Sequence, residues 1–275
     1  MRTGYRPRTF VRELVMIVVA IAFLFPVYAL VTLAFKDSTQ VANKPLSLPD
    51  PPSVSNFGEA WQSASLGSAL LNSTVITVSS VVILIVLGSL AAYFLARTAS
   101  RLSYSLYILF LVGIILPFQL GMIPLYQLVN DLGLLGTYQG MILFYSGIQL
   151  PFTVFLYTGF IRSLPADYTN AALIDGASHL QAFGYVIFPL LRPITGTVLI
   201  LNAVFIWNDF FTPLLYLGGS GHETVPVRVF AFVNEYTSNY GLVAAGLVLA
   251  ALPILLVFLI LQRYVIRGFS SGLKG

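Results

Sequence analysis

Six long apolar stretches, each almost free of Asp, Glu, Lys and Arg, constrain this chain more than any other feature of its sequence. A lipid bilayer requires roughly 20 apolar residues per crossing helix, because its core holds no water to satisfy backbone N–H and C=O groups. We therefore predict an all-α polytopic membrane protein with six transmembrane helices. The predicted spans cover residues 14–35, 69–96, 104–129, 138–161, 193–217 and 241–266.

The composition supports a membrane location. Hydrophobic residues make up 57% of the chain and charged residues only 9%, whereas soluble domains carry about 25% charged residues. The chain has no cysteine, which excludes disulfides, thiolate metal sites and cysteine nucleophiles. Its two histidines, His179 and His222, have no partner at metal-ligand spacing, so we expect no bound metal.

The basic residues predict the orientation of the spans. The predicted spans divide the 14 Lys and Arg residues unequally between the two sides of the membrane. Only Lys36, Lys44 and Arg228 lie on one side, and the other basic residues lie on the opposite side. The positive-inside rule then places both termini in the cytoplasm. The net charge of +4 is a topology signal, so we expect no nucleic-acid partner. The first span is too long for a signal-peptide core of about 7–15 residues, which predicts an uncleaved anchor.

The predicted organisation is simple. A cytoplasmic N-terminus (1–13) precedes one six-span membrane domain (14–266), and a cytoplasmic tail (267–275) follows it. The one substantial internal cytoplasmic loop covers residues 162–191. The segments 36–68 and 218–240 are expected as outer loops.

The cytoplasmic loop has the signals of two short helices. Ser163, Pro165 and Asp167 predict a helix start, since Pro suits a first turn and a carboxylate there meets the positive end of the helix dipole. We expect a helix over 168–174, a bend at Gly176, and a second short helix over 177–186 that ends before Pro189. A free loop seldom exposes a small apolar surface, so docking to another protein is expected at Ala171, Ala172, Leu173 and Ala177.

This loop resembles the EAA motif of ABC importer permeases. The matching residues are Asn170-Ala171-Ala172, Gly176 and Val186-Ile187-Phe188-Pro189, and residues 172–178 are similar to the carbohydrate-uptake, maltose-type branch. Asn170 stands where the family usually has Glu, and Val186 and Phe188 replace Ile and Leu. Further matches are Trp207-Asn208-Asp209-Phe210 and the C-terminal residues 262–275.

The resemblance implies a type I ABC importer permease fold in the bacterial cytoplasmic membrane. It implies a non-catalytic subunit of an ATP-driven, binding-protein-dependent sugar or oligosaccharide importer. The implied partners are a second permease, a cytoplasmic ATPase dimer that holds ATP and magnesium, an extracytoplasmic solute-binding protein and membrane lipid. The chain itself lacks a G-x-x-x-x-G-K-[ST] phosphate loop and is expected to bind no cofactor. The implied ATPase-coupling residues are Asn170, Ala171, Ala172, Leu173, Asp175, Gly176, Ala177 and Pro189.

Asp209 is a carboxylate within the fifth predicted span. At the centre of a bilayer such a group costs about 2.5–3.5 kcal/mol, so it faces protein, a watery cavity or the membrane interface. Two interpretations fit: Trp207, Asn208 and Asp209 line a translocation pathway, or they mark an interfacial helix end. Asn202 is a further pathway candidate, although interhelical hydrogen bonding is the commoner role of amides in apolar spans, here Asn72, Gln119, Gln149 and Asn202.

Two other functions fit the sequence less well. A secondary transporter driven by an ion gradient usually has several buried ionisable relay residues, and Asp209 is nearly alone. A membrane enzyme needs a convergent set of acids, bases or metal ligands. Asp167 and Asp175 are the nearest candidates, and their positions at a helix start and a bend account for them, so catalysis is not expected.

Overall fold

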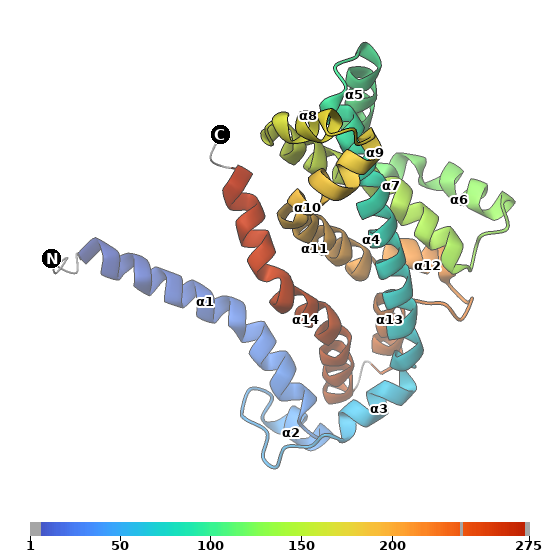
Figure 1. Ribbon diagram of the computed structural model, residues 1–275. Helices are drawn as coiled ribbons and strands as arrows, with labels where there is room; N and C mark the ends of the chain where they lie inside the picture. The colour runs from blue at the N-terminus through green and yellow to red at the C-terminus, as the bar shows by residue number, and fades with distance from the viewer. Residues whose placement is uncertain (1–6, 237–238, 273–275) are drawn as a thin grey trace. The chain divides into compact units, whose positions relative to one another are not determined.

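The computed structural model describes residues 7–236 and 239–272, with side chains described within 10–236 and 239–260. All regular elements in these ranges are helices (Figure 1). The long ones are α1 (Pro7–Ala34), α4 (Leu66–Arg97), α5 (Arg101–Ile115), α7 (Tyr138–Ser163), α11 (Arg192–Asn208) and α14 (Tyr240–Gly272). The expected all-α architecture is confirmed.

Short helices fill the segments between them. The predicted outer loops contain α2 (Ser38–Asn43), α3 (Ser55–Ser63) and α13 (Val225–Glu235). A 3₁₀ turn η1 (Phe118–Gly121) and α6 (Met122–Asp131) follow α5, and α12 (Phe211–Leu217) follows α11. The loop before α11 holds α8 (Asp167–Ile174), α9 (His179–Gln181), the π-helical segment η2 (Ala182–Ile187) and α10 (Phe188–Leu190).

Four helices of the described chain are long and apolar enough to cross a membrane unaided. They cover Phe10–Ala34, Leu66–Arg97, Tyr138–Ser163 and Tyr240–Ile260. Two further pairs of helices are long and apolar enough only when the two helices of a pair are taken together, and each pair is bent at a short break. The bend is 90° between Arg101–Ile115 and Phe118–Asp131, and 77° between His179–Leu190 and Arg192–Asn208. The count is therefore four, or six where each bent pair forms one span.

The third predicted span, 104–129, is wrong as a single helix. Helix α5 ends at Ile115, and Leu116 is extended with φ −69° and ψ 121°. Pro117 is the cause, because proline lacks an N–H and its ring disfavours helical backbone in the preceding residue. In contrast, Pro26, Pro151 and Pro253 lie inside unbroken helices.

The fifth predicted span, 193–217, also breaks. Helix α11 ends at Asn208, Asp209 is extended with φ −68° and ψ 123°, and α12 begins at Phe211. The Asp209 carboxylate accepts the backbone N–H of Thr212 (3.3 Å). A short polar side chain that binds the backbone three residues ahead stabilises a new helix start instead of continuing the old helix.

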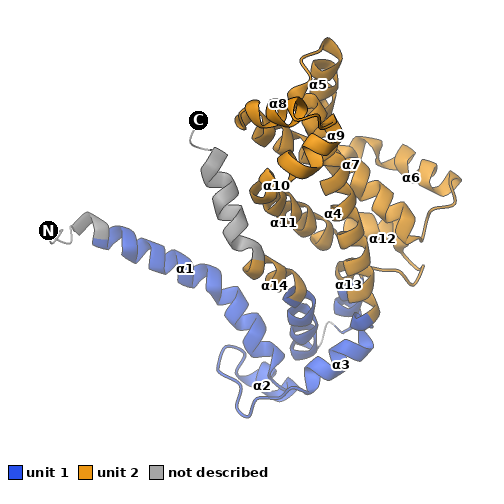
Figure 2. Ribbon diagram, viewed as in Figure 1, with its two compact units in different colours: residues 1–67, 228–252 blue, residues 68–227, 253–275 orange. Residues whose placement is uncertain are grey.

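The chain divides into two compact units, Met1–Gly67 with Arg228–Leu252, and Ser68–Val227 with Pro253–Gly275 (Figure 2). In the first unit, the Asn56 side chain donates to the carbonyls of Ala34 and Lys36 and so satisfies the last turn of α1. The ammonium of Lys36 is fully buried and donates to the carbonyls of Lys44 and Pro45 at 2.6 and 2.8 Å. The end of α1 is thus tied to the following loop.

Asp37 begins the short helix α2 of this unit. Its carboxylate accepts the backbone N–H of Gln40 and the hydroxyl of Thr39. These donors favour the charged form and hold the pKa of the Asp37 carboxyl below its ordinary value.

Helices α4, α7 and α11 form the core of the second unit. One cluster of buried apolar side chains contains Ile76, Val81, Leu84, Met141, Tyr145, Ala203, Ile206, Tyr216 and Leu217. A second contains Ala92, Tyr93, Tyr157, Ile161, Phe183, Ile187, Leu191, Ile194 and Val198. A Cβ at Gly88 would lie 2.5 Å from Cγ2 of Thr153, so glycine permits the close approach of α4 and α7.

Hydrogen bonds tie the two ends of α4 to different loops. Near its start, Asn72 donates to the carbonyl of Glu223 (2.9 Å) and accepts the hydroxyl of Tyr138 (2.6 Å). At its end, Arg97 donates to the carbonyl of Leu164 (3.0 Å). Arg97 follows Asn72 by 25 positions, a rise of roughly 37 Å at 1.5 Å per residue, which is slightly more than a hydrocarbon core of about 30 Å.

Candidate functional site

The loop between α7 and α11 bends where the sequence predicts. Helix α8 ends in a two-bond cap, in which Gly176 N–H donates to Leu173 O (3.1 Å) and Ala177 N–H to Ala172 O (3.0 Å). Gly176 has φ +86°, a conformation that residues with a Cβ rarely adopt. Helix α8 (Asp167–Ile174) begins within one residue of the predicted 168–174. Ser163 does not take part in this start, because its hydroxyl donates to Phe160 O (2.7 Å) in the last turn of α7.

The second helical segment is longer than predicted. Ser178 caps α9 by accepting the N–H of Gln181, whose side chain in turn accepts the N–H of Ser178. Helical structure then continues through η2 and α10 to Leu190, so the predicted end before Pro189 is wrong. Pro189 lies in the first turn of α10, directly after the π-helical segment η2. The Ser-x-x-Gln pattern at 178–181 is a sequence signal for this start.

Ala171, Ala172 and Ala177 of the predicted docking residues line one open hollow of about 570 Å³, whereas Leu173 does not. Within the loop, Asn170, Ala171 and Asp175 are exposed, Leu173 and Ala177 are intermediate, and Ala172 is 9% exposed. The hollow is lined by Asp167, Tyr168, Ala171, Ala172, Asp175, Ala177 and Val186. Asp167 and Asp175 thus share a hollow.

Larger apolar side chains on the same loop were not predicted. Ile174 is 85% exposed, Tyr185 82% and Leu180 69%. Side chains of this size seldom face water unless a partner or a membrane covers them. Exposure depends on how the two short helices pack, which residue types alone do not specify.

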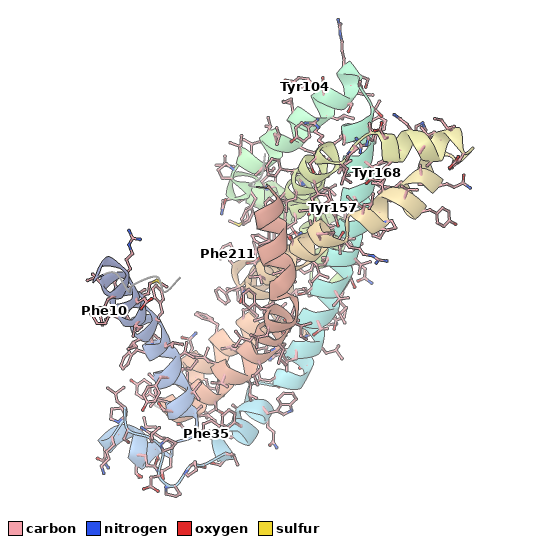
Figure 3. All side chains as sticks on the ribbon, turned by 60° about the vertical axis from the view of Figure 1, so that its left-hand side comes forward. Phe10, Phe35, Tyr104, Tyr157, Tyr168 and Phe211 are labelled. Carbon is pink, nitrogen blue, oxygen red and sulfur yellow. The ribbon has the colours of Figure 1, made fainter. Side chains whose placement is uncertain are left out.

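The opposite face of this loop is buried against the core of the second unit. Phe183, Ile187 and Leu191 belong to the second core cluster with side chains of α4, α7 and α11. Tyr157 of that cluster is fully buried and donates to the hydroxyl of Thr195 (3.0 Å), which joins α7 to α11. Figure 3 shows Tyr157 within the helices and Tyr168 on α8. The loop is therefore packed directly against three long helices.

Asp209 lies at the break between α11 and α12 and is partly buried. One oxygen accepts the hydroxyl of Tyr145 on α7 (3.1 Å), and the other accepts the N–H of Thr212. Asn208 is exposed and bonds within its own helix to Val204 O (2.9 Å). Asp209 thus fixes α12 to α7.

Trp207 and Asn202 are buried in this chain. Trp207 is 7% exposed and lines an apolar hollow of about 400 Å³ with residues of α4 and the second half of α14. Asn202 is fully buried, and its side chain donates to Thr153 Oγ1 on α7 (3.2 Å) and to Val198 O.

The other amide side chains of the predicted spans either bond to a neighbouring helix or line a hollow. Asn72 bonds across helices as expected. Gln119 and Gln149 instead line a hollow of about 590 Å³ beside the α5 break, together with Phe118, Phe152 and Phe205.

In the described residues, no group of three His, Cys, Asp or Glu side chains could hold a metal ion. His222 has a structural position, because its Nδ1 lies 2.7 Å from the carbonyl oxygen of Gly136 and its ring packs at a tilt of 42° against Tyr138. The side chains of the predicted tail 267–275, and of the similar residues from 262 onward, lie outside the described residues.

Comparisons with known proteins agree on one family. Residues 84–271 match the family described as binding-protein-dependent transport system inner membrane component. The chain is 41% identical to the melibiose/raffinose/stachyose import permease protein MelC of Bacillus subtilis, over 93% of this chain and 92% of that protein. It is 37% identical to the multiple sugar-binding transport system permease protein MsmG of Streptococcus mutans, with 92% of each covered.

A solved structure has the same fold. It is described as a bacterial ABC transporter involved in the import of the acidic polysaccharide alginate, with a TM-score of 0.83 and 22% identity. The match covers 95% of this chain and 99% of that chain.

This chain belongs to the family of binding-protein-dependent transport system inner membrane components. It is accordingly a multi-pass membrane permease and not an enzyme. The resemblance found in the sequence is confirmed.

The Tyr145–Asp209 contact predicts a specific loss of stability. Replacing Tyr145 with Phe removes the hydroxyl that bonds the carboxylate, and a hydrogen bond to a charged group contributes about 1.5–3 kcal/mol. We expect Tyr145→Phe to lower the thermal unfolding midpoint of the purified chain. Tyr104→Phe is the control, since the Tyr104 side chain is 67% exposed; equal midpoints for the two variants would contradict the proposed anchoring.

Proposed function

We propose that this chain is the transmembrane permease subunit of an ATP-driven, binding-protein-dependent importer of sugars or oligosaccharides. The observation that carries the proposal is the two-faced loop 167–190. Ile174 and Tyr185 on it are exposed, whereas Phe183 and Ile187 are buried among three long helices. A separate ATPase that grips the exposed face would move the helices through the buried face.

The coupling surface is proposed to include the residues around the α8 hollow. Ala171 and Ala177 are small and allow close approach of a partner backbone, and Gly176 sets the angle between the two short helices. Asn170 is exposed there and offers an amide in place of a carboxylate. The full proposed set is Asn170, Ala171, Ala172, Leu173, Asp175, Gly176, Ala177 and Pro189.

The family supports the proposed partners and the class of substrate. Its description names a binding-protein-dependent transport system, and two relatives are named for sugars. We propose a second permease that lies with this chain in a bacterial cytoplasmic membrane, an extracytoplasmic solute-binding protein, and a cytoplasmic ATPase dimer that holds ATP and magnesium.

The sugar is proposed to pass near the α11–α12 break. Asn208 is exposed, and Asp209 is only partly buried, so both polar groups can reach a passage formed with a second permease. Trp207 and Asn202 lie behind them and hold α11 against its neighbours.

The proposed orientation places residues 1–13, the loop 162–191 and the tail 267–275 in the cytoplasm. Contacts within the second unit agree with the grouping of segments by side, and the distribution of Lys and Arg decides which side is the cytoplasm. Arg97 bonds to Leu164, both predicted inside, and Gly136 bonds to Tyr216 at the opposite side (2.8 Å).

The energy source gives the first test. Cells expressing this chain with its partner subunits are treated with ionophores that dissipate proton and sodium gradients while ATP is maintained, and uptake of labelled melibiose, raffinose and stachyose is measured. We expect uptake to persist with ionophores and to stop when ATP is depleted. Collapse of uptake with ATP maintained would instead indicate an ion-gradient-driven secondary transporter.

The coupling loop gives a second test. Gly176→Val places a Cβ at φ +86°, where strain of about 1–3 kcal/mol reorients the two short helices. We expect ATPase co-purification and sugar uptake both to fall roughly tenfold.

Gly133→Val is the matched control. Gly133 also has a positive φ, and a Cβ at either glycine would meet nothing within 4 Å. The control carries similar strain in the turn after α6, so it should retain the ATPase. If both variants bind the ATPase normally, the coupling-loop assignment is wrong.

The orientation can be tested because the chain has no cysteine. Ala99→Cys and Asn43→Cys each introduce one thiol at an exposed position. A membrane-impermeant maleimide applied to intact spheroplasts should label Asn43→Cys at once and Ala99→Cys only after permeabilisation. The reverse order would invert the proposed topology.

A further inference from the structure

A basic hollow lies beside the turn between α4 and α5. Its volume is about 640 Å³, and it is bordered by the end of α4, the first turn of α5 and the last turn of α7. Arg97, Arg101 and Arg162 all line it, and among the described residues no Asp or Glu does. The border of the hollow therefore carries three arginines and, among the described residues, no carboxylate to neutralise them.

Two of the three arginines are held in place by the protein. Arg97 donates through Nη2 to Leu164 O (3.0 Å) and Pro165 O (3.4 Å), and its buried Nε has no partner among the described residues. The guanidinium of Arg162 lies 4.5 Å from the ring centre of Tyr107, a cation–π geometry. Their positions are thus set before any ligand arrives, which lowers the entropy lost on binding.

The start of α5 adds further donors to the same hollow. Ser100 caps this helix by accepting the N–H of Ser103 (3.1 Å), which leaves the first amides and the positive end of the helix dipole facing outward. The hydroxyls of Thr98 and Ser105 also line the hollow. Guanidinium, hydroxyl and helix N-terminal donors together are the chemistry that binds a phosphate group.

An exposed apolar surface continues from the hollow along α5. Tyr104, which lines the hollow, is 67% exposed, and Ile108 (38%) and Ile115 (78%) follow it on the same face of the helix. Figure 3 shows Tyr104 on the first turn of α5. A water-soluble phosphate compound gains nothing from such a surface. A phospholipid would place its headgroup in the hollow and its acyl chains against these side chains.

We propose that this hollow binds the phosphate headgroup of an anionic phospholipid in the cytoplasmic leaflet. Basic pockets between helices on the cytoplasmic side are suited to such headgroups. A zwitterionic choline lipid carries the same phosphate, but its quaternary ammonium meets the excess positive charge of three arginines. The site therefore selects for lipid charge, and the proposal does not depend on which solute is transported or on ATP.

The test counts bound lipids on the full chain. The chain is purified in mild detergent and titrated with phosphatidylglycerol or with phosphatidylcholine of the same acyl chains, and the bound lipid is measured by native mass spectrometry. We expect phosphatidylglycerol to be retained in preference. Arg101→Gln should weaken its binding about five-fold, and Arg162→Gln should act in the same direction, whereas Arg101→Lys keeps the charge and most of the binding.

Arg192→Gln is the matched control, since Arg192 is exposed and is also the first residue of a helix but does not line the hollow. The proposal is overturned if the two lipids bind equally or if Arg192→Gln and Arg101→Gln have the same effect. Displacement of phosphatidylglycerol by millimolar inorganic phosphate would assign the hollow to a soluble phosphate. Unchanged lipid binding in Arg101→Gln with loss of ATPase co-purification would assign it to a protein contact.

Discussion

The absence of water in the bilayer core is the constraint on which the other features of this chain depend. A helix break within a span must satisfy its own backbone groups, and the structure shows how the break at Asp209 does so. The Asp209 carboxylate receives one donor from the next helix and another from Tyr145. Outside the predicted spans, the positive φ of Gly176 lets two N–H groups turn back onto α8.

The loop before α11 lies outside the predicted spans and has two different faces. Phe183, Ile187 and Leu191 complete a cluster that the long helices cannot close alone, so the loop is an extension of their core. Ile174 and Tyr185 have no such place in this chain and remain exposed. Rigid attachment on one face and open apolar surface on the other are the physical requirements of a part that transmits movement from a separate protein.

Some basic residues of the predicted cytoplasmic side lie close to the loop that precedes α11. In Figure 1, α8, α9 and the turn between α4 and α5 lie at the same end of the second unit. Arg97 connects them, since it bonds to Leu164 and Pro165 after α7 and also lines the basic hollow. Occupation of that hollow by a lipid headgroup would therefore lie one contact away from the loop that is proposed to bind the ATPase.

The sequence by itself determined the helical class, the approximate spans and the bend at Gly176, because apolar run length, Pro and Gly act locally. Only the tertiary structure decided which apolar loop residues are buried: Phe183 is in the core and Tyr185 is not. It also decided the break at Asp209, whose second stabilising partner, Tyr145, is 64 residues away in the chain. The convergence of Arg97, Arg101 and Arg162 likewise depends on the packing of α5 and α7, and contacts between residues distant in sequence leave no local pattern.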